Sequence, residues 1–185
     1  MTSDRAPSVG EALAAFQRTN RLDPAPASAS SWTCRVGPIT LRLPNFAWRR
    51  AAIRRHDLHH ILTGYSCTMR GEFQMATWEF AAGRFAHPGA TLFCLPLVAA
   101  GLVWSPRAIW SAFRLGRNSS SLYGVRLTDE LLRSPITSLR AATQASTLSG
   151  VRAADIVAFA SLVTKSWLLV TIPIACFIGL VFGHA

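Results

Sequence analysis

Apolar residues recur at helical spacing along most of the chain, and the interruptions fall at Pro, Gly and Asn residues. Each break gives a helix start or stop, such as a cap at Asn45 or a stop at Gly116. We expect helices over 10–18, 45–62, 71–83, 91–104, 106–116 and 128–133. Alternation over 35–43 predicts one short strand, although Gly37-Pro38 interrupts it.

The C-terminal apolar segment differs from the others in length. Ile156 to Phe182 spans 27 residues with one charge, Lys165, which is enough to cross a bilayer core of about 30 Å at about 1.5 Å per residue. A buried hairpin divided at Pro173 is the alternative. Three arginines precede the segment and His184 follows it, which favours a cytoplasmic N-terminal side. The arginines are Arg133, Arg140 and Arg152.

These patterns predict an all-α protein: a compact helical domain followed by an apolar, transmembrane helix. We divide the chain into a tail over 1–31, a helical domain over 32–140, a linker over 141–155 and the membrane segment over 156–183. The low charge content and positive mean hydropathy of +0.27 exclude disorder for most of the chain. The number of apolar segments excludes a polytopic transporter.

The formal net charge of +10 comes almost entirely from arginine, because Lys165 is the only lysine. Arginine binds phosphate and carboxylate groups, so anionic lipids or an anionic substrate fit this composition. A solvated surface shaped by codon usage fits it equally well. The basic residues are scattered and show no zinc-finger or helix-turn-helix spacing, so we expect no nucleic-acid partner.

Histidine and acidic residues gather in the sequence His56-Asp57-Leu58-His59-His60. On a helix, His60 lies about 40° and Asp57 about 100° around the axis from His56, so these three side chains share one edge. His59 lies about 60° to the other side. Two imidazoles and a carboxylate suit a divalent cation such as Zn, Fe or Mn.

A single helix edge leaves the coordination incomplete, so a further ligand is expected. Glu72 follows an eight-residue turn and begins the next helix, which we expect to pack antiparallel to the first. Glu79 lies seven residues later in nearly the same direction, as a further ligand or as a residue that orients a ligand. The alternative is that the two histidines lie on a polar helix face and that both glutamates are solvated.

Three other metal-binding motifs do not match the residues and spacings of this chain. Membrane desaturases need about eight histidines, whereas the chain has five. An HD-type phosphohydrolase needs an upstream histidine, which is missing. A zincin needs Glu at the position of Asp57 and a different spacing to the second histidine.

The pattern His56-Asp57-x-x-His60-x(11)-Glu72 resembles the signature of coenzyme Q biosynthesis protein 4 homologs. The flanking residues are also similar to bacterial members of that family: Pro44-Asn45, the run RHDLHHILTGY, Arg70-Gly71-Glu72 and Trp78-Glu79. The similarity covers roughly residues 36 to 140 and weakens toward its end. The C-terminal apolar segment lies beyond it.

The resemblance implies an all-helical, membrane-associated metal protein of ubiquinone biosynthesis. It implies that the four signature residues hold the metal, with zinc first and Fe, Mn or Mg as alternatives. The implied substrate is a prenylated aromatic-ring precursor that loses its C1 carboxyl group oxidatively, which favours an enzyme. The rival hypothesis is a scaffold or prenyl-lipid carrier in which the metal only joins two helices.

Arg49 and Arg50 precede the metal motif by one to two helical turns and point roughly to its side. They are candidates to hold a substrate carboxylate or phosphate, and a solvated arginine cluster beside a membrane is the alternative. As partners we expect the prenylated precursor, membrane lipids, other quinone-biosynthesis proteins and a second copy of the chain. The expected location is a bacterial inner membrane, with the metal domain on its cytoplasmic face.

Overall fold

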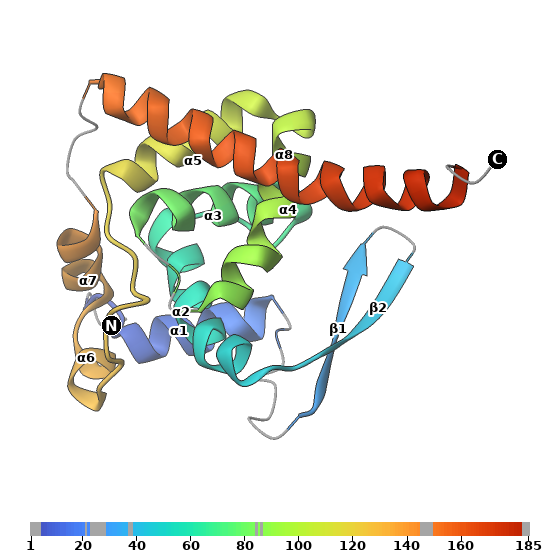
Figure 1. Ribbon diagram of the computed structural model, residues 1–185. Coiled ribbons are helices and arrows are strands. Elements are labelled where there is room, and N and C mark those ends of the chain that lie inside the picture. The colour runs from blue at the N-terminus through green and yellow to red at the C-terminus, as the bar shows by residue number, and fades with distance from the viewer. Residues whose placement is uncertain are drawn as a thin grey trace. The chain divides into compact units, whose positions relative to one another are not determined.

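The computed structural model describes residues 5–20, 22, 29–36, 39–83, 85, 87–144 and 150–182. In these ranges the chain forms eight helices and one two-stranded sheet, so it is mostly helical as expected (Figure 1). Contacts divide it into two units. Unit 1 comprises Met1–Gly64 and Leu122–Thr143, and unit 2 comprises Tyr65–Ser121 and Gln144–Ala185. These units divide the chain differently from the ranges that the sequence suggested.

In its described residues, unit 1 contains four helices and a hairpin: α1 (Val9–Thr19), β1 (Ser31–Val36), β2 (Ile39–Pro44), α2 (Ala47–Thr63), α6 (Asp129–Arg133) and α7 (Ile136–Thr143). Its core combines apolar residues from α1, α2, α7 and the segment before α6, including Val9, Leu58, Leu122 and Leu139. Helix α1 contributes to this core, so the expected tail over 1–31 contains a packed helix.

Helix α1 begins with reciprocal hydrogen bonds between Ser8 and Glu11. The backbone N–H of Ser8 donates to the Glu11 carboxylate at 2.7 Å, and that of Glu11 donates to the Ser8 hydroxyl at 3.2 Å. These bonds lower the pKa of Glu11. The backbone N–H of Val9 also donates to the carbonyl oxygen of Ser134 at 2.9 Å, which attaches α1 to the end of α6.

Two local predictions in unit 1 are wrong. The single strand over 35–43 is an antiparallel hairpin, in which Val36 pairs with Ile39 and Ser31 with Pro44. Gly37 and Pro38, which interrupted the alternation, lie outside the described residues. Asn45 does not cap α2: the N-cap is Phe46, and the Asn45 amide donates to the carbonyl oxygen of Ala29 at 3.0 Å.

Unit 2 consists of α3 (Met69–Ala82), α4 (Pro88–Trp104), α5 (Pro106–Arg117) and α8 (Ala153–Phe182). Helix α3 packs on α4 and α5, and α8 packs on α4 and α5 (Figure 1). Gly116 was expected to stop α5, but the helix continues to Arg117. A Cβ at Gly116 would lie 2.5 Å from the carbonyl oxygen of Trp78, so glycine here permits the close packing of α5 on α3.

Helix α8 is one continuous helix of 30 residues that contains Pro173, so the hairpin divided at this proline is wrong. It begins three residues before the expected segment, and Ala153–Pro173 is long and apolar enough to cross a membrane. Ala158, Phe159, Leu162 and Leu169 also pack against a core of unit 2. Helix α7, which the sequence did not predict, follows directly after Pro135.

Candidate metal centre

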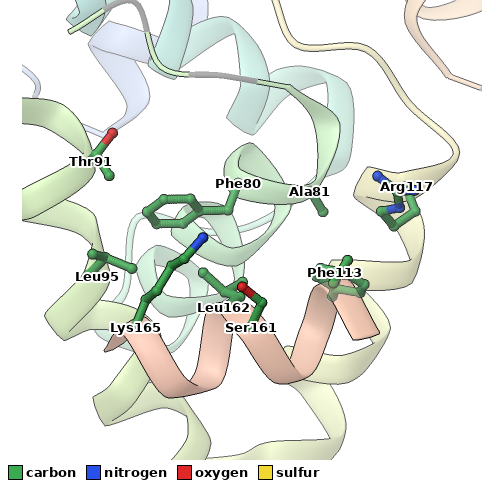
Figure 2. Close-up of a pocket in the computed structure, with 10 residues that line it drawn as sticks. Phe80, Ala81, Thr91, Leu95, Phe113, Arg117, Ser161, Leu162 and Lys165 are labelled. Atoms are coloured by element: carbon green, nitrogen blue, oxygen red, sulfur yellow. The ribbon is translucent and has the colours of Figure 1, made fainter. Parts of the chain in front are cut away.

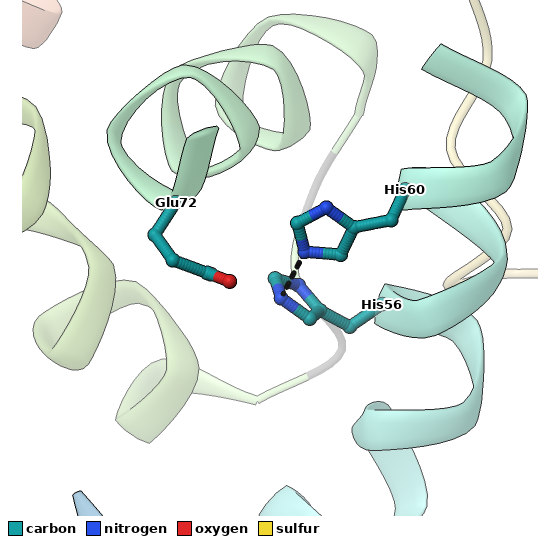
Figure 3. A group of neighbouring side chains, drawn as sticks. All are labelled: His56, His60 and Glu72. Atoms are coloured by element: carbon teal, nitrogen blue, oxygen red, sulfur yellow. Dashed lines mark hydrogen bonds between the residues drawn. The ribbon is translucent and has the colours of Figure 1, made fainter. Parts of the chain in front are cut away.

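His56 and His60 lie one turn apart on α2, and their rings converge. Their Nε2 atoms are 3.1 Å apart and the rings meet edge to face at 86° (Figure 3). Two protonated Nε2 atoms could not approach so closely, so at least one of them presents its lone pair. The sequence predicted this convergence from the i, i+4 spacing.

The spacing of the two nitrogens fits a shared cation. Nitrogens that each lie about 2.0–2.1 Å from a zinc ion, at angles of about 90–110°, are separated by about 2.8–3.4 Å. The observed 3.1 Å falls in this range. The residue types and the separation therefore both suit a divalent metal.

Helix α1 fixes the position of this histidine pair. The Phe16 ring stacks on the His60 ring, with 5.6 Å between centroids and 21° between planes. His60 is consequently buried, with 2% of its surface exposed. The sequence gave no indication of this contact, because Phe16 lies 44 residues earlier in a segment expected to be a tail.

Asp57, the third expected ligand on α2, contacts α1. One of its carboxylate oxygens, Oδ2, accepts a hydrogen bond from the Gln17 amide at 2.8 Å, and the side chain is buried. Among the described residues, the group of side chains that could hold a metal ion does not include Asp57. The assignment of Asp57 as a metal ligand stays a prediction.

His59 has a different role from its two neighbours. Its Nε2 atom accepts the backbone N–H of Leu122 at 2.8 Å, and its ring meets that of Tyr123 edge to face. Because Nε2 accepts, the ring proton lies on Nδ1 in the neutral form. The side chain is completely buried, so His59 joins α2 to the segment that precedes α6.

Glu72 lies in the first turn of α3 in unit 2, where the helix dipole favours a carboxylate. Thr68 caps this helix: its hydroxyl accepts from the backbone N–H of Gly71, and its carbonyl oxygen accepts from that of Glu72 at 2.8 Å. Figure 3 also draws the Glu72 carboxylate. His56, His60 and Glu72 offer two imidazole nitrogens and one carboxylate oxygen, a group that could hold a metal ion of unknown identity.

Glu79 lies two turns further along α3 and is fully buried. Its charge acts on Cys94 of the neighbouring helix α4, as does that of Glu72. Burial first, then the Glu79 carboxylate and the Glu72 carboxylate, raise the pKa of the Cys94 thiol well above its ordinary value. Both acids therefore act electrostatically on the same part of α4. The role of Glu79 as a ligand or an orienting residue stays a prediction.

Arg49 and Arg50 contact the start of α2. The Arg49 guanidinium donates to the Asn45 side-chain oxygen at 3.0 Å and lies 3.8 Å from the centroid of the Trp32 ring. The Arg50 guanidinium donates to the Asn45 carbonyl oxygen. Since these contacts join α2 to the hairpin, they give both residues a structural role, and anion binding by them stays a prediction.

Comparison with known proteins leaves these predictions untested, since no family model, curated protein or solved structure matches the chain.

Proposed function

We propose that the chain is a divalent-metal protein that acts at a membrane on a prenylated aromatic-ring precursor of ubiquinone. The observation that carries this proposal is the 3.1 Å separation of the His56 and His60 Nε2 atoms within the pattern H-D-x-x-H-x(11)-E. Zinc is the metal that we expect first, because a borderline cation suits a mixed set of imidazole and carboxylate ligands.

Glu72 can reach the histidine pair through a short connection. Only residues 64–68 lie between the end of α2 and the start of α3. Six peptide steps span at most about 20 Å, which limits how far the first turn of α3 can lie from the last turn of α2. The chain connectivity therefore supports Glu72 as the further ligand, outside α2, that the sequence pattern suggests.

Several residues of unit 1 would hold the two imidazoles in place. Arg55 donates to the backbone carbonyl oxygens of Leu122 and Val125, and His59 accepts from the backbone N–H of Leu122. These bonds fix the rotation of α2 about its axis, so His56 and His60 keep a constant direction. A bound cation would supply Lewis acidity to a phenol or carboxylate oxygen of the precursor.

Membrane association by α8 is part of the proposal. Its Ala153–Pro173 segment has the length and hydropathy of a span, and we propose that the arginine-rich region before it stays in the cytoplasm. The prenyl tail of a precursor would then meet the protein at the bilayer. Alkaline extraction of membranes tests this directly: an anchored chain stays in the lipid pellet, whereas recovery in the supernatant would contradict the anchor.

The metal-dependent role is tested by complementation. In a strain that lacks the gene, we expect carboxylated prenyl-ring precursors to accumulate and ubiquinone to fall, and wild-type protein to reverse both. Glu72→Ala should fail to complement, whereas Glu130→Ala, which removes an exposed carboxylate of α6, should succeed. Complementation by Glu72→Ala would contradict metal-dependent catalysis and favour a scaffold or prenyl-lipid carrier. Unchanged quinones after deletion would contradict the pathway assignment.

A further inference from the structure

Unit 2 contains a cavity of about 230 Å³ whose lining comes from all four of its helices (Figure 2). Phe80 of α3, Leu95 of α4, Phe113 of α5 and Leu162 of α8 form apolar walls. The cavity shares no residue with the group formed by His56, His60 and Glu72. An engineered apolar cavity of about 150 Å³ is known to bind benzene, so the space here suffices for one substituted ring.

One face of α8 contributes both apolar and polar groups to this cavity. Ala158, Ser161, Leu162 and Lys165 recur at helical spacing and all line it. Figure 2 shows the Lys165 side chain extending from α8 toward the Phe80 ring, with the Ser161 hydroxyl one turn away. The opening therefore combines a cation and a hydroxyl with aromatic and aliphatic surfaces.

The charge at the cavity comes from Lys165 and from Arg117. The Arg117 Nε atom lies 2.9 Å from one carboxylate oxygen of Asp155, and the Nε atom of Arg152 lies 3.0 Å from the other, so a single carboxylate is shared by two arginines. Within the part of the chain that the structure describes, no acidic group lies within ion-pair distance of Lys165. The cavity therefore presents the charge of Lys165 and part of the charge of Arg117 next to apolar walls, which complements an organic anion.

We propose that this cavity binds an aromatic carboxylate. A single ring fits the volume and can pack against Phe80 and Phe113, while the carboxylate pairs with Lys165 and accepts a hydrogen bond from Ser161. Inorganic phosphate, in contrast, would make no use of the apolar walls formed by Phe80 and Phe113. This assignment is independent of the metal centre and does not rest on the proposed function.

The test uses the full chain in nanodiscs of zwitterionic lipid and follows ¹⁹F resonances of two probes, 4-fluorobenzoate and its neutral counterpart 4-fluorobenzamide. We expect saturable binding of the benzoate and at least tenfold weaker binding of the benzamide. Hexanoate and inorganic phosphate should displace the benzoate at least tenfold less well than unlabelled benzoate does. Equal binding of benzoate and benzamide, or no saturable benzoate binding, would overturn the proposal. If hexanoate competes as well as benzoate, the ligand does not need an aromatic ring. If phosphate competes as well as benzoate, the ligand does not need a carboxylate.

Substitutions at Lys165 locate the binding. Lys165→Met keeps the aliphatic stem and should weaken 4-fluorobenzoate binding at least tenfold, whereas Lys165→Arg should stay within about threefold of wild type. Arg107→Met, which removes an exposed cation of α5 outside the cavity, should bind like wild type. Undiminished binding by Lys165→Met, or an equal loss in Arg107→Met, would show that the probe binds elsewhere.

Discussion

Replacing His59 and His60 separately by alanine distinguishes a structural histidine from a metal ligand. Both side chains are buried and adjacent in sequence, yet they face different partners. His59 accepts the backbone N–H of Leu122, whereas His60 meets His56 at 3.1 Å. We therefore expect His59→Ala to destabilise unit 1 and retain metal, and His60→Ala to lose stoichiometric metal.

The loss in free energy of unfolding that we expect for His59→Ala has two contributions. The N–H of Leu122 would be left without its acceptor in a buried site, which costs about 1–3 kcal/mol. The missing ring would leave a cavity beside the Tyr123 ring and the core of unit 1, which adds about 2 kcal/mol. The sum of about 3–5 kcal/mol corresponds to a decrease in Tm of roughly 6–20 °C for a chain of this size.

Two measurements on the same preparations check this reasoning. Thermal unfolding gives the change in Tm, and elemental analysis after dialysis gives the metal content per chain. His59→Gln is the matched control, because its side-chain oxygen can accept the Leu122 N–H, and it should recover about 1–3 kcal/mol of the loss. A wild-type Tm for His59→Ala would refute the hydrogen-bond argument. Equal metal loss from folded His59→Ala and His60→Ala would refute the ligand assignment.

Two further predictions concern packing within each unit. Gly71→Ala would place a Cβ atom 1.9 Å from the backbone carbonyl oxygen of Ser66, so we expect a loss of about 1–3 kcal/mol or more by denaturant titration. Gly124→Ala, with no atom within 4 Å of the new Cβ, should change stability by less than about 0.5 kcal/mol, and equal effects would contradict the steric argument. Leu58→Ala removes a fully buried core side chain and should cost about 2–5 kcal/mol in the same assay, whereas Leu92→Ala, 54% exposed, should cost less than about 1 kcal/mol.

The helices of this chain were largely predictable because their signals are local. Helical spacing, Pro at helix starts and the Thr128 position before α6 depend on residues within one or two turns. The hairpin was harder to predict from sequence. Its two strands are short, and across Gly37-Pro38 they look like one alternating run. Helix α7 was missed because Pro135 suggested an ending, although proline equally favours the first turn of a new helix.

Helical geometry already separates His59 from the edge that His56 and His60 share, but the contacts of these side chains could not be predicted, because each contact depends on a residue far away in the chain. His59 pairs with Leu122, 63 positions later, and Asp57 pairs with Gln17, 40 positions earlier. Helical geometry shows that His56 and His60 share an edge, but it does not show what packs on either side of that edge. The side chain of Leu122 does not indicate this hydrogen bond, because the donor is the backbone N–H. Sequence therefore identifies the candidate ligands and sets His59 apart from them, whereas the tertiary contacts of α2 show that His59 holds the helix in place.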